Sequence, residues 1–267
     1  MNMKKILYIG WLILAGITLS CEDFLEAPSQ SSFDESLIFS DPTLAASAID
    51  GIKVPLGETN SYRGRFLTHY GSNTDIEWNN SSTTINARTD LARYVNSPAN
   101  TDMNTTNNAW AMMYTGIERA NICIRGLRTY GNPASGNEMG QLLGEALTLR
   151  AIYYADLVRG WGDVVARFEP VSSETMYLAK SSRDVIYKQL ISDLEEAATL
   201  VAWPNETAAT ANTENINKAF VKAFRARICL AAAGYSQYPD GIRRSNDPDL
   251  TVAKLYPVAL QECKDVI

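Results

Sequence analysis

The chain has 267 residues, of which 46% are hydrophobic and 20% are charged, with a formal net charge of −6 at pH 7. This composition is typical of a globular protein with a buried core and argues against a disordered chain. The excess of acidic residues also argues against nucleic acid as a partner, because the phosphate backbone is bound by clustered lysines and arginines.

The N-terminus has the pattern of a secretory signal peptide. Lys4 and Lys5 lead an apolar run over residues 6–19, which closes on the small residue Ser20. The run has 14 residues, whereas a membrane-spanning helix needs about 20. We therefore expect residues 1–20 to be removed on export, which takes away two lysines and no acid and leaves a mature charge of −8.

Cys21 stands directly after Ser20, as in the lipid-attachment site of bacterial lipoproteins. In that chemistry the cysteine sulfur takes a diacylglycerol and the new N-terminus takes another acyl chain such as palmitate, and two or more chains anchor a protein stably to a membrane. Thr18 departs from the usual leucine at its position, which leaves plain secretion as the alternative. Lipidation is the favoured prediction, with residues 21–36 as a polar tether and a domain at 37–267.

The remaining cysteines fall on apolar faces of predicted helices, and they are Cys123, Cys229 and Cys263. Their number is odd, and their spacing matches neither a disulfide framework nor a zinc site. We expect three buried free thiols, no bound metal and no cofactor.

The first helix of the predicted domain begins at Asp41, an N-cap followed by Pro42, and ends at Pro55 and Gly57. From there to residue 106 helical periodicity nearly vanishes, and the segment is rich in Asn, Ser and Thr with dispersed aromatic residues. Loops longer than about 12 to 15 residues are uncommon inside a compact domain and are usually functional. We therefore expect this long insertion to be a binding region or locally irregular structure.

Amphipathic periodicity returns after residue 106 and continues to the end of the chain. Glycine and proline interrupt it between successive helices. The predicted helices cover residues 107–127, 137–160, 182–201, 215–235 and 249–267. The expected fold class is therefore all-α.

The second helix pair resembles the first, because Leu149-Arg150-Ala151 matches Phe224-Arg225-Ala226 at an offset of 75 residues. Two antiparallel helices per unit with small residues at the crossings are typical of a tetratricopeptide-like repeat. Arg150 and Arg225 recur at the same point in both units, which predicts a buried or half-buried structural salt bridge at each. Each unit needs a neighbour to cover its apolar face, so the last helix is expected to lack a partner.

Taken in order, these motifs resemble the SusD/RagB family of outer-membrane lipoproteins. The resemblance is carried by the blocks SCEDFLEAPS, SPANTDMNTTNNAWAMMYTGIERANICI, GEALTLRAIYYADLVRGWGDV, SRDVIYKQLISDLEEA, KAFVKAFRARICLAAAGY and LYPVALQECKDVI. The family usually continues Gly-Asp-Val as Pro-Leu, whereas Val165 and Ala166 stand here, which predicts a less rigid turn. Family members are also about twice as long, so the chain looks like an N-terminal half.

The resemblance implies a helical-repeat protein on the cell surface that is not an enzyme. It would capture glycan and deliver it to a TonB-dependent (SusC-like) transporter in the outer membrane, and a lipid would anchor it to that membrane. Peptide capture by the same kind of protein is one alternative. A helical-repeat scaffold that binds only protein partners is another.

The long insertion offers the residue types that bind sugars, since apolar sugar faces stack on aromatic rings and hydroxyl groups bond to polar side chains. Trp78 is the expected platform, and an aromatic plug beneath a loop is its alternative role. The hydrogen-bonding candidates are Asn79, Asn80 and Arg88, and Tyr94 is a lesser aromatic candidate. These residues cannot be aligned one by one with the family.

Other aromatic residues recur at helical spacing and are expected in the core: Trp110, Tyr114, Tyr153, Tyr154 and Trp161. Catalysis is not predicted, because the chain has a single histidine, His69, with no nucleophile motif around it. No phosphate-binding glycine loop or metal-ligand cluster is visible either.

Overall fold

The described part of the chain is built almost entirely from helices, which confirms the predicted all-α class. The computed structural model describes residues 34–58 and 107–267, and between these ranges only residues 64, 87, 90, 95, 97–101 and 103. Residues Glu35–Ile267 form one compact unit, to which all the elements below belong. The helices are α2 (Glu35–Ser40), α3 (Pro42–Lys53), α5 (Ala109–Gly126), α6 (Glu138–Trp161), α7 (Arg183–Leu200), α8 (Lys218–Ala233) and α9 (Val252–Val266), with short turns η2 (Val54–Gly57), η5 (Leu127–Gly131) and η6 (Ala208–Thr210) and the strands β1 (Ser236–Tyr238) and β2 (Gly241–Arg243).

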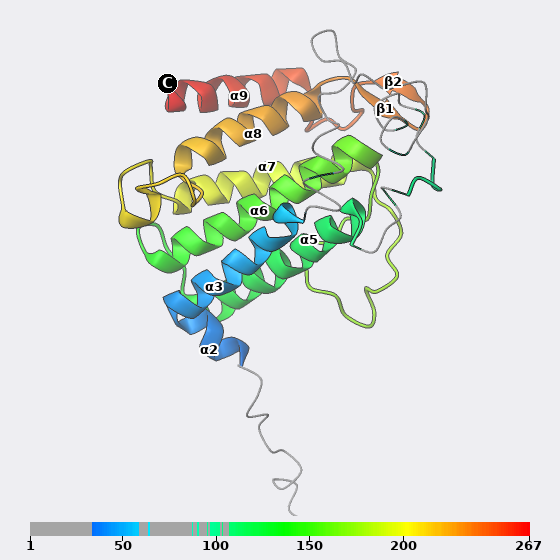
Figure 1. The fold of residues 1–267 in the computed structure, drawn as a ribbon. Helices are drawn as coiled ribbons and strands as arrows, with labels where there is room; N and C mark the ends of the chain where they lie inside the picture. The colour runs from blue at the N-terminus through cyan, green and yellow to red at the C-terminus, as the bar shows by residue number, and fades with distance from the viewer. Residues whose placement is uncertain are drawn as a thin grey trace, which may run out of the picture. The chain divides into compact units, whose positions relative to one another are not determined.

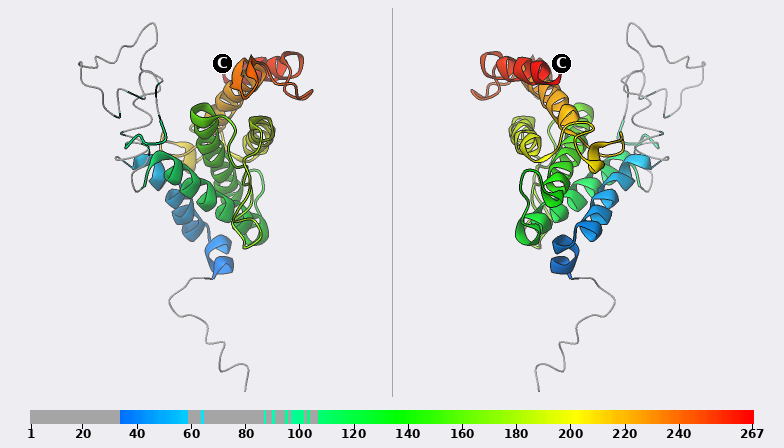
Figure 2. Two further views of the ribbon diagram at one scale, coloured as in Figure 1. Left: turned by 90° about the vertical axis from the view of Figure 1, so that its right-hand side faces the viewer. Right: turned by 90° about the vertical axis from the view of Figure 1, so that its left-hand side faces the viewer.

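From α5 onward, consecutive helices pack against one another in chain order and run in alternating directions (Figure 1). This is the arrangement of a tetratricopeptide-like array, as predicted. Helix α3 packs across both α5 and α6, and it lies on the other side of α6 from α7 (Figure 2). Because the direction alternates, α6 and α8 run parallel to each other, and both contact α7.

Polar side chains fix where the helices begin. Asp41 Oδ1 accepts hydrogen bonds from the backbone N–H groups of Thr43 and Leu44 at 2.8 and 3.0 Å, so it caps α3 as predicted. The other N-caps with side-chain hydrogen bonds are Asn108 for α5, Asn137 for α6, Ser182 for α7 and Asn217 for α8. The predicted helices from residue 107 onward are confirmed, with ends that differ by at most three residues.

The core is centred on α6, whose Tyr153 and Tyr154 are fully buried. The Tyr153 hydroxyl donates a 2.6 Å hydrogen bond to the carbonyl of Ile52 and thereby joins α6 to the end of α3. Its ring lies against Gly116 of α5, where a Cβ atom would stand 2.2 Å from the ring. A glycine at this crossing therefore allows α5 and α6 to approach closely around a large side chain.

Two expectations were wrong. Cys123 and Cys229 are buried, and burial raises their thiol pKa values to about 12 and about 11, but Cys263 is exposed. The reason is that α9 turns Leu255, Ala259 and Glu262 toward the core and leaves its other faces exposed. The tether, expected to extend to residue 36, gives way to α2 already at residue 35.

The antiparallel hairpin of β1 and β2 was not predicted. Its strands have three residues each, too few to show an alternating pattern. Among the helices in the described ranges, none has the length and apolar character needed to cross a membrane.

Candidate functional site

The predicted ligand-binding residues all lie outside the described residues. They are Trp78, Asn79, Asn80, Arg88 and Tyr94. The same is true of the signal peptide, of the lipidation site Cys21 and of His69. The structure does describe both ends of the long insertion, where the chain leaves η2 and where it enters α5 at its N-cap.

An aromatic cluster lies next to the start of α5. The ring of Trp110 is 5.1 Å from that of Tyr114 and 5.3 Å from that of Trp161, measured between centroids. The cluster continues through Tyr154 to Phe168. Tyr154 is buried, and the rings of Trp110, Tyr114 and Trp161 are half-buried and packed on the core. The expectation that these aromatics serve the core is therefore confirmed.

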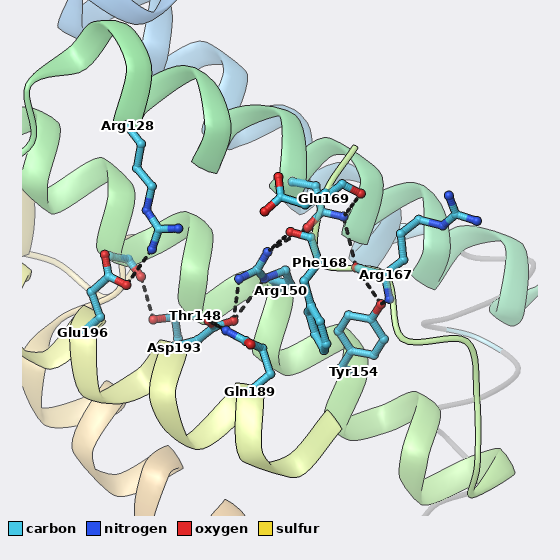
Figure 3. A network of polar contacts seen from close by, with 12 residues as sticks. Arg128, Thr148, Arg150, Tyr154, Arg167, Phe168, Glu169, Gln189, Asp193 and Glu196 are labelled. Atoms are coloured by element: carbon cyan, nitrogen blue, oxygen red, sulfur yellow. Dashed lines mark hydrogen bonds and ion pairs between the residues drawn. The ribbon is translucent and has the colours of Figure 1, made fainter. Parts of the chain in front are cut away.

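A buried arginine at the middle of α6 organises the polar interior (Figure 3). The Arg150 side chain is only 3% exposed, and its Nε and Nη2 atoms donate to Asp193 Oδ2 at 3.0 and 2.8 Å. Its Nη1 atom donates to Asn121 Oδ1 and to the carbonyl of Phe168, both at 2.9 Å. Every nitrogen of this guanidinium group therefore has a partner, which a buried cation requires.

The same network holds the segment after α6 against the helices. Asn121 donates to the carbonyls of Arg167 and Glu169, both at 3.1 Å, and the Tyr154 hydroxyl donates to the carbonyl of Arg167 and accepts from its N–H group. Tyr114 donates to the carbonyl of Val165 at 2.9 Å. These side chains hold the backbone of residues 165–169 against α5 and α6.

Arg225 occupies the equivalent position in α8. It donates to Glu262 of α9 at 2.6 Å and forms an ion pair with Glu195 of α7 at 3.0 Å. The structural salt bridges predicted for the two repeated arginines are thus confirmed. They join each of the two helices to its neighbours.

A first cavity, of about 620 Å³, lies between α3, the N-terminal half of α6 and η6. We call it the acidic cavity, because its lining residues include four acids (Asp50, Glu138, Glu145 and Glu206) and two lysines (Lys53 and Lys218). The Glu145 side chain is 3% exposed, and burial raises its pKa although Gln141 donates to it at 3.0 Å and Lys53 lies 3.7 Å away. The buried polar side chains of the acidic cavity, Glu145 and Gln141, are thus paired with each other.

A second cavity, of about 1080 Å³, follows the groove between the parallel helices α6 and α8 and ends at the start of α7 and the hairpin. We call it the arginine groove. Its lining includes three arginines and one acid, together with aromatic and amide side chains: Asp156, Arg159, Trp161, Arg183, Tyr187, Phe220, Phe224, Arg227 and Gln237. The rings of Phe220 and Phe224 are stacked with their centroids 5.8 Å apart.

Arg183 lines the arginine groove beside Gly162. Its side chain is 9% exposed, and its Nε atom donates to Asp163 Oδ1 at 3.0 Å. Burial raises the pKa of Asp163, but the hydrogen bonds from Arg183 outweigh burial and hold it below its usual value. The guanidinium group also lies over the ring of Tyr238, 4.7 Å from its centroid.

The terminal Nη1 and Nη2 groups of Arg183 donate no hydrogen bond within the described part of the chain. As for metals, no group of three or more His, Cys, Asp and Glu side chains among the described residues is placed to hold an ion.

The sequence interpretation missed the arginine groove. Its residues come from α6, α7, α8 and the hairpin, so no single stretch of sequence contains it. One signal was available, because Phe220, Phe224, Arg227 and Ala231 follow one another at helical spacing on α8 and line the groove together. This spacing alone could not identify the groove, because the groove also depends on how α8 is placed beside α6.

An array of antiparallel helix pairs with a groove between α6 and α8 defines a helical-repeat protein. The SusD-like family model, described as "Starch-binding associating with outer membrane", matches residues 23–230. The chain belongs to this family.

The relatives support the same assignment. SusD-like proteins P25 and P38 of Formosa agariphila are 27% and 28% identical to the chain over 215 and 205 residues, which cover 77% and 74% of the chain. These stretches make up only 40% and 38% of the two relatives. The chain therefore spans about 40% of the length of the curated relatives it matches.

Solved structures share the fold at lower identity. A SusD homolog from Bacteroides thetaiotaomicron superposes with a TM-score of 0.70 at 18% identity, covering 87% of the chain and 41% of the homolog. A laminarin-binding SusD-like protein superposes with a TM-score of 0.56 at 19% identity, covering 70% of the chain and 40% of that protein.

Proposed function

We propose that the protein captures glycan at the cell surface and passes it to a TonB-dependent, SusC-like transporter in the outer membrane. The observation that carries the proposal is the family match over residues 23–230, with its starch-binding and outer-membrane description. Two of the structurally similar proteins are a laminarin-binding SusD-like protein and a protein whose crystal structure contains a xylogluco-oligosaccharide. Capture needs binding without chemistry, so no catalytic residue is assigned.

The proposed ligand contacts are those of the long insertion. Trp78 would stack on a sugar face, with Asn79, Asn80 and Arg88 as hydrogen-bonding groups and Tyr94 as a second aromatic contact. In support, both ends of the insertion join the rigid helical body, next to the half-buried rings of Trp110 and Trp161. A site on such a frame keeps its position while the loop adapts to the ligand.

Retention of the complete protein in a native gel that contains polysaccharide tests glycan capture. We expect laminarin or starch to slow the wild type, and Trp78→Ala to reduce the retardation by about tenfold in apparent affinity, as loss of a buried aromatic anchor does. Tyr177→Ala is the matched control, because Tyr177 is 91% exposed on a loop of the described region. Equal retention of all three proteins would overturn the assignment of Trp78.

If no polysaccharide retards the wild type but short peptides bind to it, peptide capture replaces glycan capture. If neither binds and only protein partners are recovered, the scaffold alternative replaces both. Co-purification of the complete protein with the product of a neighbouring transporter gene tests delivery. Failure to recover the transporter under mild detergent extraction would contradict the proposed partner.

The membrane attachment is proposed to be a lipid on Cys21. Two or more acyl chains hold a protein firmly to a bilayer without a spanning segment. Labelling cells with radioactive palmitate should mark the wild type and leave Cys21→Ala unlabelled and released into the soluble fraction. Cys263→Ala is the matched control, since that exposed thiol lies on α9. A labelled Cys21→Ala protein would refute lipidation at this residue.

A further inference from the structure

The arginine groove contains a buried cation whose hydrogen-bonding capacity is largely unused. A guanidinium group has five N–H donors, and Arg183 uses only its Nε–H group, on Asp163. Leaving buried polar groups without hydrogen-bond partners is unfavourable. A ligand that supplied a planar pair of oxygen atoms to Nη1 and Nη2 would remove this penalty.

The charge of the arginine groove selects an anion. Three arginines and one aspartate line it, although the whole chain carries a net charge of −6. Arg227 is exposed on α8 and makes no hydrogen bond or ion pair in the described ranges, so it can turn toward a bound ligand. The positive end of the α7 dipole also lies here, because α7 begins at Arg183.

The fork geometry of the guanidinium group favours an oxyanion, such as a carboxylate or a sulfate. Arginine binds such oxyanions through two parallel hydrogen bonds, whereas a halide offers only one point of contact. Asp163 already accepts from Nε and from the backbone N–H group of Arg183. The two terminal nitrogens are therefore left for an oxyanion from outside the chain.

The rest of the groove suits a ring-shaped ligand longer than one sugar. Phe220 is 44% exposed and is stacked on Phe224, so the pair presents an apolar surface beside the arginines. From Phe220 to Ala231 the lining of α8 covers 12 residues, which is roughly 16 Å at the rise of an α-helix. Aromatic rings beside charged hydrogen-bond donors are what an oligosaccharide with acidic substituents needs.

We propose that the arginine groove binds acidic oligosaccharides, with Arg183 holding the carboxylate or sulfate group of one sugar, Arg227 assisting, and Phe220 and Phe224 stacking on a neighbouring ring. The claim that the ligand is a saccharide rests on the proposed function, whereas the claim that Arg183 binds an oxyanion does not. The two proposals concern different residues and are tested by different variants, so one can fail while the other stands.

Isothermal titration of the complete protein with three tetrasaccharides tests the proposal. The probes are tetragalacturonate, its fully methyl-esterified form and a sulfated galactose tetrasaccharide. We expect the acidic forms to bind at least about tenfold more tightly than the ester, because hydrogen bonds to charged groups are the stronger ones. The form that binds more tightly, carboxylate or sulfate, identifies the group that Arg183 prefers.

Variants separate the groove from general electrostatics. Arg183→Met should weaken tetragalacturonate binding by about tenfold or more, and Arg227→Gln by roughly threefold to tenfold. Arg244→Gln is the matched control, since it removes one positive charge from an exposed position of the hairpin region outside the groove lining. Its affinity should stay within about twofold of the wild type. Circular dichroism melts establish that each variant is folded, and Arg227 is exposed enough for its variant to fold in any case.

Equal binding of the acid and its methyl ester would overturn the proposal, as would unchanged affinity in both Arg183→Met and Arg227→Gln. Failure of the proposed function gives a different pattern. Suppose that neutral polysaccharides never retard the protein, that tetragalacturonate binds, and that Arg183→Met abolishes that binding. The proposed glycan site at Trp78 would then be rejected, and the proposed site in the arginine groove would be supported. Binding of inorganic sulfate without any acidic tetrasaccharide would leave an oxyanion site only and would refute the saccharide assignment.

Discussion

The middle of α6 and the groove at its C-terminal end each contain a buried arginine, and the two arginines have different numbers of partners. Arg150 donates from all three nitrogens to Asp193, Asn121 and a backbone carbonyl. The Arg183 side chain donates from Nε alone, to an aspartate whose side chain is 16% exposed. The first has the complete set of partners that a structural arginine needs, and the second keeps donors available.

The two cavities differ in the same way. In the acidic cavity Glu145, Gln141 and Lys53 satisfy one another, with further bonds to backbone groups. In the arginine groove positive charge is in excess and the ring of Phe220 is exposed. A buried polar group that stabilises the fold therefore has a full set of hydrogen-bond partners, whereas one that is available to a ligand has unused donors or acceptors. The predictions below test this distinction by stability and by pH.

Removal of Arg150 should have the largest effect. Arg150→Met leaves Asp193 buried without its cation and removes the hydrogen bond to the carbonyl of Phe168. The free energy of unfolding should therefore fall by about 3 to 5 kcal/mol. Urea unfolding followed by circular dichroism measures this. Arg128→Met is the control, because Arg128 forms an ion pair with Glu196 in which both side chains are 40% or more exposed, and it should lose at most about 1 kcal/mol. Equal losses in the two variants would contradict the assigned role of Arg150.

A methyl group at the α5–α6 crossing should have the next largest effect. In Gly116→Ala the new Cβ would stand 2.2 Å from the buried ring of Tyr153, and overpacking of this kind destabilises by about 1 to 3 kcal/mol. Gly51→Ala is the control on α3, since a Cβ there meets nothing within 4 Å. That variant should be as stable as the wild type or more stable by up to about 1 kcal/mol. A harmless Gly116→Ala would show that the crossing is looser than described.

Much of this framework could be predicted from the sequence, because local chemistry determines it. Asp41 and Pro42 mark a helix start wherever they occur together, and apolar residues at helical spacing mark a buried face. The structural role of Arg150 was also predictable, since the same three-residue pattern recurs 75 residues later in Arg225. The sequence did not reveal which acids the two arginines meet.

The arginine groove could not be predicted for a physical reason. Arg183 and Gly162 are 21 residues apart in the chain, and only the packing of α7 against α6 brings the side chain beside that glycine. The sequence around Arg183 shows an N-cap and a helix start, which is what a structural residue would show as well. The role of Trp78 stays a prediction, because the residues around it lie outside the described ranges.

Removal of Arg183 should affect stability much less than removal of Arg150. Arg183→Met loses one ion pair with Asp163, whose side chain is 16% exposed, and a contact with the ring of Tyr238. Together these losses should destabilise by about 1 to 2 kcal/mol. The same urea titration measures it, with Arg150→Met as the reference. A loss as large as that of Arg150→Met would mean that Arg183 is a structural residue. That result would contradict the inference that its Nη1 and Nη2 groups are available to a ligand.

The smallest expected effect concerns Asp156, the acid in the arginine groove. Burial raises its pKa from 3.8 to about 6, although Arg159 and Arg227 act in the opposite direction. Between pH 4 and about 6 the folded state then binds more protons than the unfolded state, so the free energy of unfolding falls as the pH rises through this window. Above pH 6 this contribution stays constant.

Asp156→Asn should therefore be more stable than the wild type at pH 7.5, by on the order of 1 kcal/mol because the side chain is only half-buried. At pH 4 the difference should vanish. The same variant removes the one negative charge of the groove lining, so tetragalacturonate should bind to it more tightly at pH 7.5. Thermal melts at both pH values, together with the titration, measure the two effects in one protein. A gain in stability without a gain in affinity would show that Asp156 is buried beside the groove but does not face the ligand.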